Sequence, residues 1–482
     1  MQRPPDLFDR DREWSDLATF LAVDRPGLRI GVVSGRRRQG KSYLLRRLVA
    51  AHGGQYSLAL EEERRPALDR FGRDVAGALG VPAQLRLADW PEALAVASRS
   101  GLLVLDEFPY LLRGAPELPS ALQAWYDETR SGPPVAVILC GSALSVMGEL
   151  LCGAHPLRGR ARLDLLVRPF DYRTARRYWG IVDPEVALRM HAVVGGTPGY
   201  RDLTDPAPGT PDELDEWLAA NVLNPAHALF GETEYLLRED PRITDRALYQ
   251  SVLAAAAAGQ TSPGAIAGAL GRDARSIGHP LDVLRTAGFL TRSDDVLAQR
   301  RPVYSVTDPV VRFHMLVVRP RLAQYEERHA AQAWAASREV FASRILGPHV
   351  EELARQWTAR YATPETLGGA VSVVGQAVLN DPAGRARHEI DVLALADGET
   401  PRARSVRVRA IGEAKATNRP RGAADLRRLE HLRGLLTARG HDAAGARLLL
   451  FSRTGFAGDL VAAGRRRGDV VLVDLRRLYE GE

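Results

Sequence analysis

Short apolar runs alternate with stretches of helical spacing over the first third of the chain. Residues 28–34 and 135–139 are short apolar runs, and residues 101–105 are continuously hydrophobic, which is typical of a strand buried in a parallel sheet. Leucines at 44, 45 and 48 follow the first run with the spacing of a helix. The pattern therefore predicts an α/β core domain over residues 1–170.

The remaining pattern predicts three further units. Helical spacing interrupted by prolines over residues 171–238 indicates a helical lid. Three helices followed by a hairpin predict a winged helix over residues 239–325. Residues 326–482 follow the order α-β-β-β-α-β. The predicted fold class is thus α/β multidomain, as a length of 482 residues favours.

Composition and charge narrow the class of protein. With 45% hydrophobic and 26% charged residues the chain is globular and not globally disordered. A net charge of +6 and a pI near 9.5 favour a polyanionic partner such as DNA, but only weakly. We expect no membrane partner, because no apolar stretch is long enough to span a bilayer. Two cysteines cannot form a disulfide framework, so we expect a cytoplasmic protein.

Lysine is almost absent from this arginine-rich chain. Of 65 basic side chains only Lys41 and Lys415 are lysines. Arginine and lysine are not interchangeable where a compact point charge is needed. The two positions are therefore the first candidates for chemistry.

Lys41 lies in Gly-Arg-Arg-Arg-Gln-Gly-Lys-Ser, between a predicted strand and a predicted helix. That context is the one a P-loop requires. Gly35 and Gly40 let the backbone wrap around a phosphate, Lys41 can reach the β and γ phosphates, and Ser42 can bind Mg²⁺. The motif predicts that the cofactors are ATP and Mg²⁺.

Polar residues follow the next two predicted strands. Asp106 is placed to hold the Mg²⁺ shell as a Walker B aspartate, and Glu107 to polarise the attacking water. Ser142 follows the third strand and is either a γ-phosphate sensor or an ordinary turn serine. Arg160 is either an arginine finger, acting in its own or a neighbouring subunit, or part of a solvated basic turn.

Together with these motifs, residues 8–14 and the Gly-Gly-Thr-Pro-Gly-Tyr segment at 195–200 carry a family resemblance. The chain resembles the archaeal-type ATPases, which belong to the STAND-related branch of AAA-like P-loop NTPases. The resemblance implies that residues 8–14 lie near the adenine and that residues 195–200 belong to a lid near the nucleotide.

The predicted winged helix carries basic residues on or near its recognition helix. They are Arg272, Arg275, His279 and Arg285. These side chains can contact DNA phosphates and base edges. Alternatively, the winged helix packs against the ATPase as a regulatory or oligomerisation module, so the partner is DNA, another protein or a second copy of the chain.

The second lysine lies in Glu-Ala-Lys at the end of a predicted strand. With Asp391 on the neighbouring strand, Glu413 and Lys415 resemble the restriction-endonuclease-like PD-(D/E)xK group, and Glu351 matches the helical acid that such enzymes often add. Asp391 and Glu413 supply hard oxygens for Mg²⁺ or Mn²⁺, and strand alternation places Lys415 on the same face as Glu413. The alternative is a degenerate nuclease fold that binds DNA or protein without cutting.

Two functions therefore remain open. In the first, nucleotide state controls metal-dependent cleavage of DNA by the last domain. In the second, the chain is a STAND-like signalling switch whose last domain does not cleave.

Overall fold

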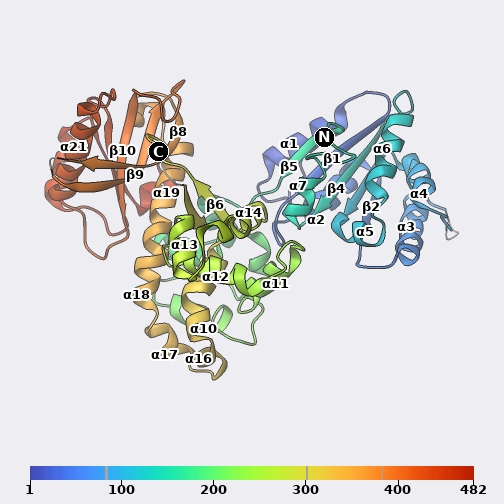
Figure 1. The fold of residues 1–482 in the computed structure, drawn as a ribbon, viewed down its shortest axis with the longest axis horizontal. Helices are drawn as coiled ribbons and strands as arrows, with labels where there is room; N and C mark the ends of the chain where they lie inside the picture. Colours follow the sequence, from blue (N-terminus) through green and yellow to red (C-terminus); the bar gives the residue numbers. More distant parts are fainter. Residues whose placement is uncertain (82–84, 300–301, 383) are drawn as a thin grey trace.

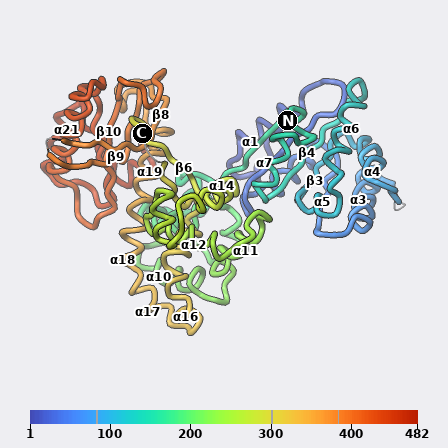
Figure 2. Tube along the Cα trace, viewed as in Figure 1, coloured from blue at the N-terminus to red at the C-terminus, as the bar shows by residue number. Residues whose placement is uncertain are grey.

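The computed structural model describes residues 1–81, 85–299, 302–382 and 384–482. Figure 1 shows an N-terminal α/β unit at one end, coloured blue to teal, and a second sheet at the other, coloured orange to red. Green and gold helices lie between them, as the tube in Figure 2 also shows. No helix in the described residues is long and apolar enough to cross a membrane.

The first sheet has five parallel strands in the order β2-β3-β4-β1-β5. The strands are β1 (Leu28–Ser34), β2 (Gln55–Leu58), β3 (Leu102–Asp106), β4 (Val135–Gly141) and β5 (Ala161–Leu166). The predictions of β1, β3 and β4 are confirmed, and β2 and β5 were missed. Both missed strands lie at the edges of the sheet, and polar residues interrupt their apolar runs: Gln55 and Ser57, which are buried, in β2, and Arg162 and Asp164, which are exposed, in β5.

Helices cover both faces of this sheet, as a doubly wound fold requires. One face packs against α1 (Asp11–Ala22) and α2 (Lys41–His52). The other packs against a larger set: α3 (Arg64–Ala78), α4 (Trp90–Ala97), α5 (Phe108–Gly114), α6 (Leu118–Glu128) and α7 (Leu144–Glu149). The predicted α/β core with a parallel sheet is confirmed.

A chain of short helices follows the first sheet. It comprises α8 (Tyr172–Trp179), α9 (Pro184–Val194), α10 (Leu214–Asn221), α11 (Glu232–Glu239), α12 (Arg246–Ala257), α13 (Pro263–Ala269) and α14 (Gly278–Thr286). A hairpin of β6 (Leu290–Ser293) and β7 (Val303–Val306) comes next. Ser262 caps α13 by accepting from the Ala265 amide, and Pro263 fits the first helical turn. The three helices and hairpin share one apolar cluster, hereafter the hairpin unit (residues 246–306).

Helices then lead to the second sheet: α15 (Pro309–Phe313), α16 (Leu322–Glu326), α17 (Ala330–Ala335), α18 (Arg338–Val340), α19 (Gly347–Arg360) and α20 (Pro364–Leu367). The sheet order is β12-β11-β10-β9-β8. Its elements are β8 (Val371–Asp381), β9 (Ala386–Ala396), β10 (Val408–Lys415), α21 (Ala423–Ala438), β11 (Arg447–Ser452), α22 (Gly458–Arg466), β12 (Val470–Asp474) and α23 (Leu475–Glu480). β8, β9 and β10 pair antiparallel, whereas β10, β11 and β12 pair parallel. The predicted strands are confirmed, and α22 and α23 were missed.

One apolar cluster joins the helices after the first sheet to the second sheet. It contains Tyr172 and Val193 together with Trp357 and Phe451, all nearly fully buried. The Tyr172 hydroxyl also donates to the Leu478 carbonyl at 2.8 Å. The helices α8 and α9 are therefore packed as one body with the C-terminal sheet.

Candidate nucleotide site and acidic site

The glycine loop between β1 and α2 fits a phosphate cradle. A Cβ at position 35 would lie 2.5 Å from the Val167 carbonyl oxygen, and Gly40 has φ +87°, so both positions favour glycine. Lys41 is buried at 5% exposure, and its Nζ donates to the Arg36 carbonyl of the same loop at 3.0 Å. A nucleotide phosphate is a stronger acceptor than that carbonyl, and the N-terminus of α2 adds a favourable dipole.

The carboxyl ends of β3 and β4 supply the acids and the serine that face this loop. Because β4 lies between β1 and β3, Ser142 sits between the loop and Asp106. Asp106 is fully buried. Burial acts to raise its pKa, but hydrogen bonds from Cys140, Ser42 and Tyr56 outweigh it and lower the pKa. Asp106 is therefore ionised and hydrogen-bonded to Ser42 of the P-loop. A carboxylate oxygen and a hydroxyl oxygen are the kind of ligands that Mg²⁺ prefers.

Two of the residues that bind Asp106 escaped the sequence reasoning. Cys140 lies in the buried strand β4, two residues before Ser142, and Tyr56 lies on the missed strand β2. The position of Tyr56 on a parallel strand next to β3 was the signal that could have pointed to this residue.

Glu107 has a strained backbone, with φ +55° in the left-handed region. Its carboxylate accepts from the Ser142 hydroxyl at 3.2 Å. Burial, and then the charge of Asp106, raise its pKa. Strain at a non-glycine residue costs about 1–3 kcal/mol and clusters at functional sites. Glu107 and Ser142 line one cavity of about 180 Å³ with Tyr110 and Glu239, which leaves room for water beside the carboxylate.

The two segments that carried the resemblance both contact the P-loop. Arg10 donates to the Gln39 carbonyl at 3.0 Å, and its guanidinium carbon lies 4.5 Å from the centre of the Phe170 ring. The Gly199 amide donates to the Arg38 carbonyl at 3.0 Å. A Cβ at Gly199 would lie 2.8 Å from Arg38 Cβ, so glycine is required for this close approach.

The three arginines inside the P-loop each reach a carboxylate from a later part of the chain. Arg36 pairs with Asp308 at 2.8 Å, Arg37 with Glu239 at 2.6 Å, and Arg38 with Glu232 at 2.9 Å. These three pairs are called the arginine clasp below. The Glu232 side chain is 1% exposed, whereas the Arg37 side chain is 49% exposed. The Arg38 pair thus contains the most buried carboxylate of the clasp, and the Arg37 pair is the most solvated of the three.

Arg160 is held within the first α/β unit. Its guanidinium pairs with Asp127 of α6 at 2.9 Å and donates to the Pro156 carbonyl at 3.0 Å. An arginine finger would have to leave these partners in order to reach a phosphate.

The predicted acidic site lies where α19, β9 and β10 meet. Asp391 Oδ2 accepts from the Ala414 amide at 2.9 Å. Burial raises the pKa of Asp391, and burial together with the charge of Asp391 raises the pKa of Glu351 to about 7. A divalent cation would offset the repulsion between these two carboxyls, so their oxygens fit such an ion.

Glu413 is the most enclosed acid of this site. Its carboxylate contacts Lys415 at 2.9 Å and Arg421 and Arg428 at 3.4 Å each. Its Oε2 is buried without a hydrogen bond. In the described residues, Glu351, Asp391 and Glu413 do not each bring one oxygen within 4.8 Å of the others. A shared metal would require the Glu413 carboxylate to turn from the arginines towards Asp391.

A cavity of about 510 Å³ opens beside this site. Glu351, Asp391 and Arg355 line it from the second sheet and α19, and Thr261 and Ser305 line it from the hairpin unit. The acidic site and the hairpin unit therefore face a common space.

Comparison with known proteins identifies the N-terminal unit. Residues 7–180 match the sequence profile of an ATPase domain predominantly from Archaea. The chain carries an ATPase domain. The match takes in the P-loop, Asp106, Glu107 and Ser142 and ends just after α8.

Three further comparisons extend beyond the ATPase domain. An uncharacterised protein of Methanocaldococcus jannaschii is 24% identical over 323 residues, covering 66% of this chain and 70% of the relative. The Walker-type ATPase of Pyrococcus abyssi is 21% identical with a TM-score of 0.49, covering 65% of this chain and 97% of that one. The Aeropyrum pernix ORC2 protein, solved in ADPNP–ADP complexes, is 15% identical with a TM-score of 0.43, covering 70% and 97%.

Proposed function

We propose that the ATPase domain binds and hydrolyses Mg-ATP at the P-loop. Gly35, Gly40 and Lys41 hold the phosphates, and Ser42 and Asp106 hold Mg²⁺, which neutralises phosphate charge. Glu107, whose pKa is raised by burial and by the charge of Asp106, orients the attacking water. Ser142 bridges Glu107 and the γ-phosphate position. Arg160 acts as an arginine finger once its guanidinium has left Asp127.

The arginine clasp is the observation that supports our proposal that nucleotide state controls the rest of the chain. The backbone of Arg36, Arg37 and Arg38 forms the cradle, while their side chains hold carboxylates of later elements. A polyphosphate brought beside these guanidiniums competes with those carboxylates for positive charge. Binding and loss of nucleotide therefore change how tightly the later elements are held.

We propose DNA as the partner and the C-terminal unit as a nuclease-like domain under this control. Arg272, Arg275, His279 and Arg285 are all exposed on the hairpin unit, the candidate winged helix, where a polyanion can reach them. The cavity of about 510 Å³ beside Glu351 and Asp391 is the space in which we place the phosphodiester backbone. Mg²⁺ or Mn²⁺ held by Asp391 and Glu413, with Glu351 assisting, would polarise the scissile phosphate, and Lys415 would stabilise its charge.

One observation favours the second function, a STAND-like switch with a non-cleaving C-terminal module. Glu413 is already neutralised by Lys415, Arg421 and Arg428. A carboxylate held in this way gains less from a metal ion. In this alternative the clasp controls docking of DNA, a protein or a second copy of the chain.

A plasmid assay separates the two functions. Wild type, Lys415→Ala and Asp391→Ala are incubated with supercoiled plasmid and Mg²⁺ or Mn²⁺, each without nucleotide, with ATP and with ADP. We expect nicking by the wild type that depends on nucleotide and is lost in both variants. Plasmid that stays intact under every condition would rule out the nuclease and leave the switch.

A further inference from the structure

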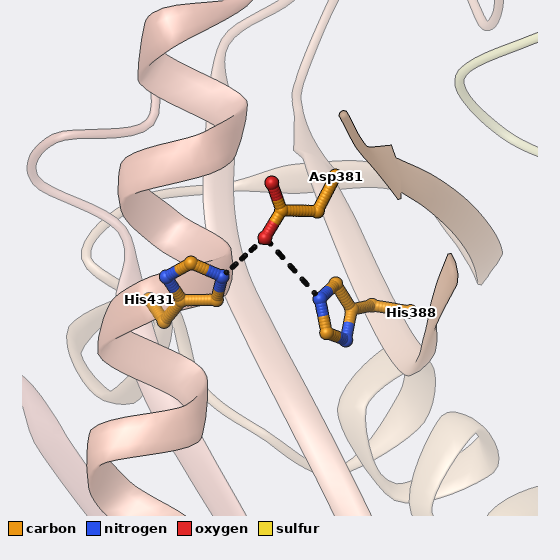
Figure 3. A group of neighbouring side chains, drawn as sticks. All are labelled: Asp381, His388 and His431. Carbon is orange, nitrogen blue, oxygen red and sulfur yellow. Dashed lines mark hydrogen bonds and ion pairs between the residues drawn. The ribbon is translucent and has the colours of Figure 1, made fainter. Parts of the chain in front are cut away.

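A second cluster of metal-ligand side chains lies away from the nucleotide and acidic sites. Asp381 ends β8, His388 lies on β9 across the hairpin, and His431 projects from α21 (Figure 3). One ligand atom from each lies within 4.8 Å of the other two, and this is the sole such group in the described residues. The three residues come from three elements, so the fold and not local sequence brings them together.

The three side chains converge on one point. His431 Nε2 lies 3.1 Å and His388 Nε2 lies 3.7 Å from the same oxygen, Asp381 Oδ2. Two ligands held at about 2.0–2.1 Å in a tetrahedral site lie roughly 3.3 Å apart, which falls between these two distances. The two imidazole rings meet nearly perpendicularly, at 82°, so both can direct a nitrogen lone pair at one ion without stacking.

Neighbouring residues orient the Asp381 carboxylate so that one of its oxygens is available to a metal ion. The Gly384 amide donates to Asp381 Oδ1 at 2.9 Å, which fixes the carboxylate and leaves Oδ2 to the imidazoles. A Cβ at position 384 would lie 2.6 Å from Asp381 Oδ2, so only glycine leaves that oxygen accessible. His388 Nε2 is buried, and Asp381 Oδ2 at 3.7 Å is too far for a good hydrogen bond. A buried nitrogen with so weak a contact is costly, and a metal ion between the two atoms would satisfy both.

We propose that Asp381, His388 and His431 bind a divalent transition-metal ion, with Zn²⁺ as the best fit. Two imidazoles and one carboxylate are nitrogen and oxygen ligands that suit zinc and its neighbours in the first row better than Mg²⁺. The His431 side chain is 52% exposed, so the fourth position is open to water. Bound metal ties the tip of the β8–β9 hairpin to α21, the helix whose Arg428 contacts Glu413.

Metal binding to the full chain tests this site. Chelator-stripped protein, without nucleotide, is titrated with Zn²⁺ by calorimetry and with Co²⁺ by visible absorption. We expect one Zn²⁺ site, weakened at least about 100-fold in Asp381→Asn and His431→Ala. His329→Ala is the matched control, since His329 is comparably exposed at 60%. It should bind as the wild type does, and Asp391→Asn shows whether the zinc is held at the acidic site instead.

His431→Cys keeps the proposal falsifiable where alanine harms the fold. A thiolate ligand should retain Co²⁺ and add a sulfur-to-cobalt charge-transfer band that the wild type lacks. Equal zinc affinity in the wild type, Asp381→Asn and His431→Ala would overturn the proposal, as would loss of binding in Asp391→Asn alone. Circular dichroism of every variant shows whether a lost site reflects a lost fold.

Discussion

Two histidines at the junction of α9 and α19, the buried His349 and the half-buried His191, make the packing of this region dependent on pH. His191 Nδ1 and His349 Nε2 lie 2.9 Å apart. Burial lowers the pKa of His191 to about 4, with Asp171 opposing and Arg312 adding to the effect, and burial lowers that of His349 as well. Both rings are therefore neutral in the folded protein at neutral pH.

The sign follows from proton linkage. A histidine in unfolded chain has a pKa near 6.5, so below that pH the unfolded state binds protons that folded His191 does not. Stability is therefore lost as the pH falls from about 6.5 towards about 4. The drop in pKa from about 6.5 to about 4 corresponds to roughly 3 kcal/mol at the limit, and to about 2 kcal/mol at pH 5.

Glu351, on the same helix α19, acts in the opposite direction. Its pKa is raised to about 7, so the stability it contributes is present below about pH 4.5 and is lost as the pH rises through 7. Between pH 7.5 and pH 5 the protein regains about 2 kcal/mol from this carboxyl. Glu351 thus offsets part of the acid loss from the two histidines in the wild type, so a variant is needed to isolate the contribution of His191.

His191→Gln removes the titrating ring and keeps a neutral polar side chain. Opening free energies of α9 and α19 are measured by hydrogen–deuterium exchange at pH 7.5 and pH 5, corrected for the intrinsic exchange rates. We expect the wild type to lose about 2 kcal/mol more than His191→Gln over this interval. His52→Gln, an exposed histidine on α2, should match the wild type. Parallel behaviour of wild type and His191→Gln would refute the assignment of a neutral His191.

The other predictions concern the ATPase domain and the arginine clasp. Glu107→Gln should bind ATP like the wild type but hydrolyse it about 10²–10⁴-fold more slowly, whereas Lys41→Ala should lose binding itself; calorimetry and phosphate release distinguish the two. Arg38→Ala leaves Glu232 buried without its cation and should destabilise the protein by about 3–5 kcal/mol in urea unfolding. Arg37→Ala, at the exposed pair, should cost about 1 kcal/mol or less, and equal losses in the two variants would contradict the burial argument.

The sequence predicted those parts of the fold and site in which local pattern decides the structure. β1, β3 and β4 are largely apolar, the P-loop with Lys41 follows β1, and Asp106 ends β3, so strand, loop and chemistry coincide in the sequence. β5 escaped because its burial alternates along an edge, where Arg162 and Asp164 face solvent.

Long-range pairings could not be read in the same way. Nothing local links Arg36 to Asp308, which is 272 residues away, or His388 to His431 across two elements. Such contacts depend on how whole units pack against one another, and hydrophobic periodicity carries no information about that packing. The same limit applies to Glu413, whose pairing with Arg428 depends on where α21 crosses β10.

The two kinds of contact around the ATPase domain decide which parts can move. The two apolar clusters of the first sheet include no described residue beyond Val167, whereas the cluster that begins at Tyr172 extends to Tyr479. Separating α8 and α9 from the C-terminal sheet would expose that apolar surface, at about 25 cal/mol for each Å². The clasp, by contrast, consists of ion pairs, which exchange partners when a phosphate offers a stronger one. A nucleotide-driven change should therefore leave α8, α9 and the second sheet together and move them as one body against the first sheet, with Arg36, Arg37 and Arg38 as the contacts that change.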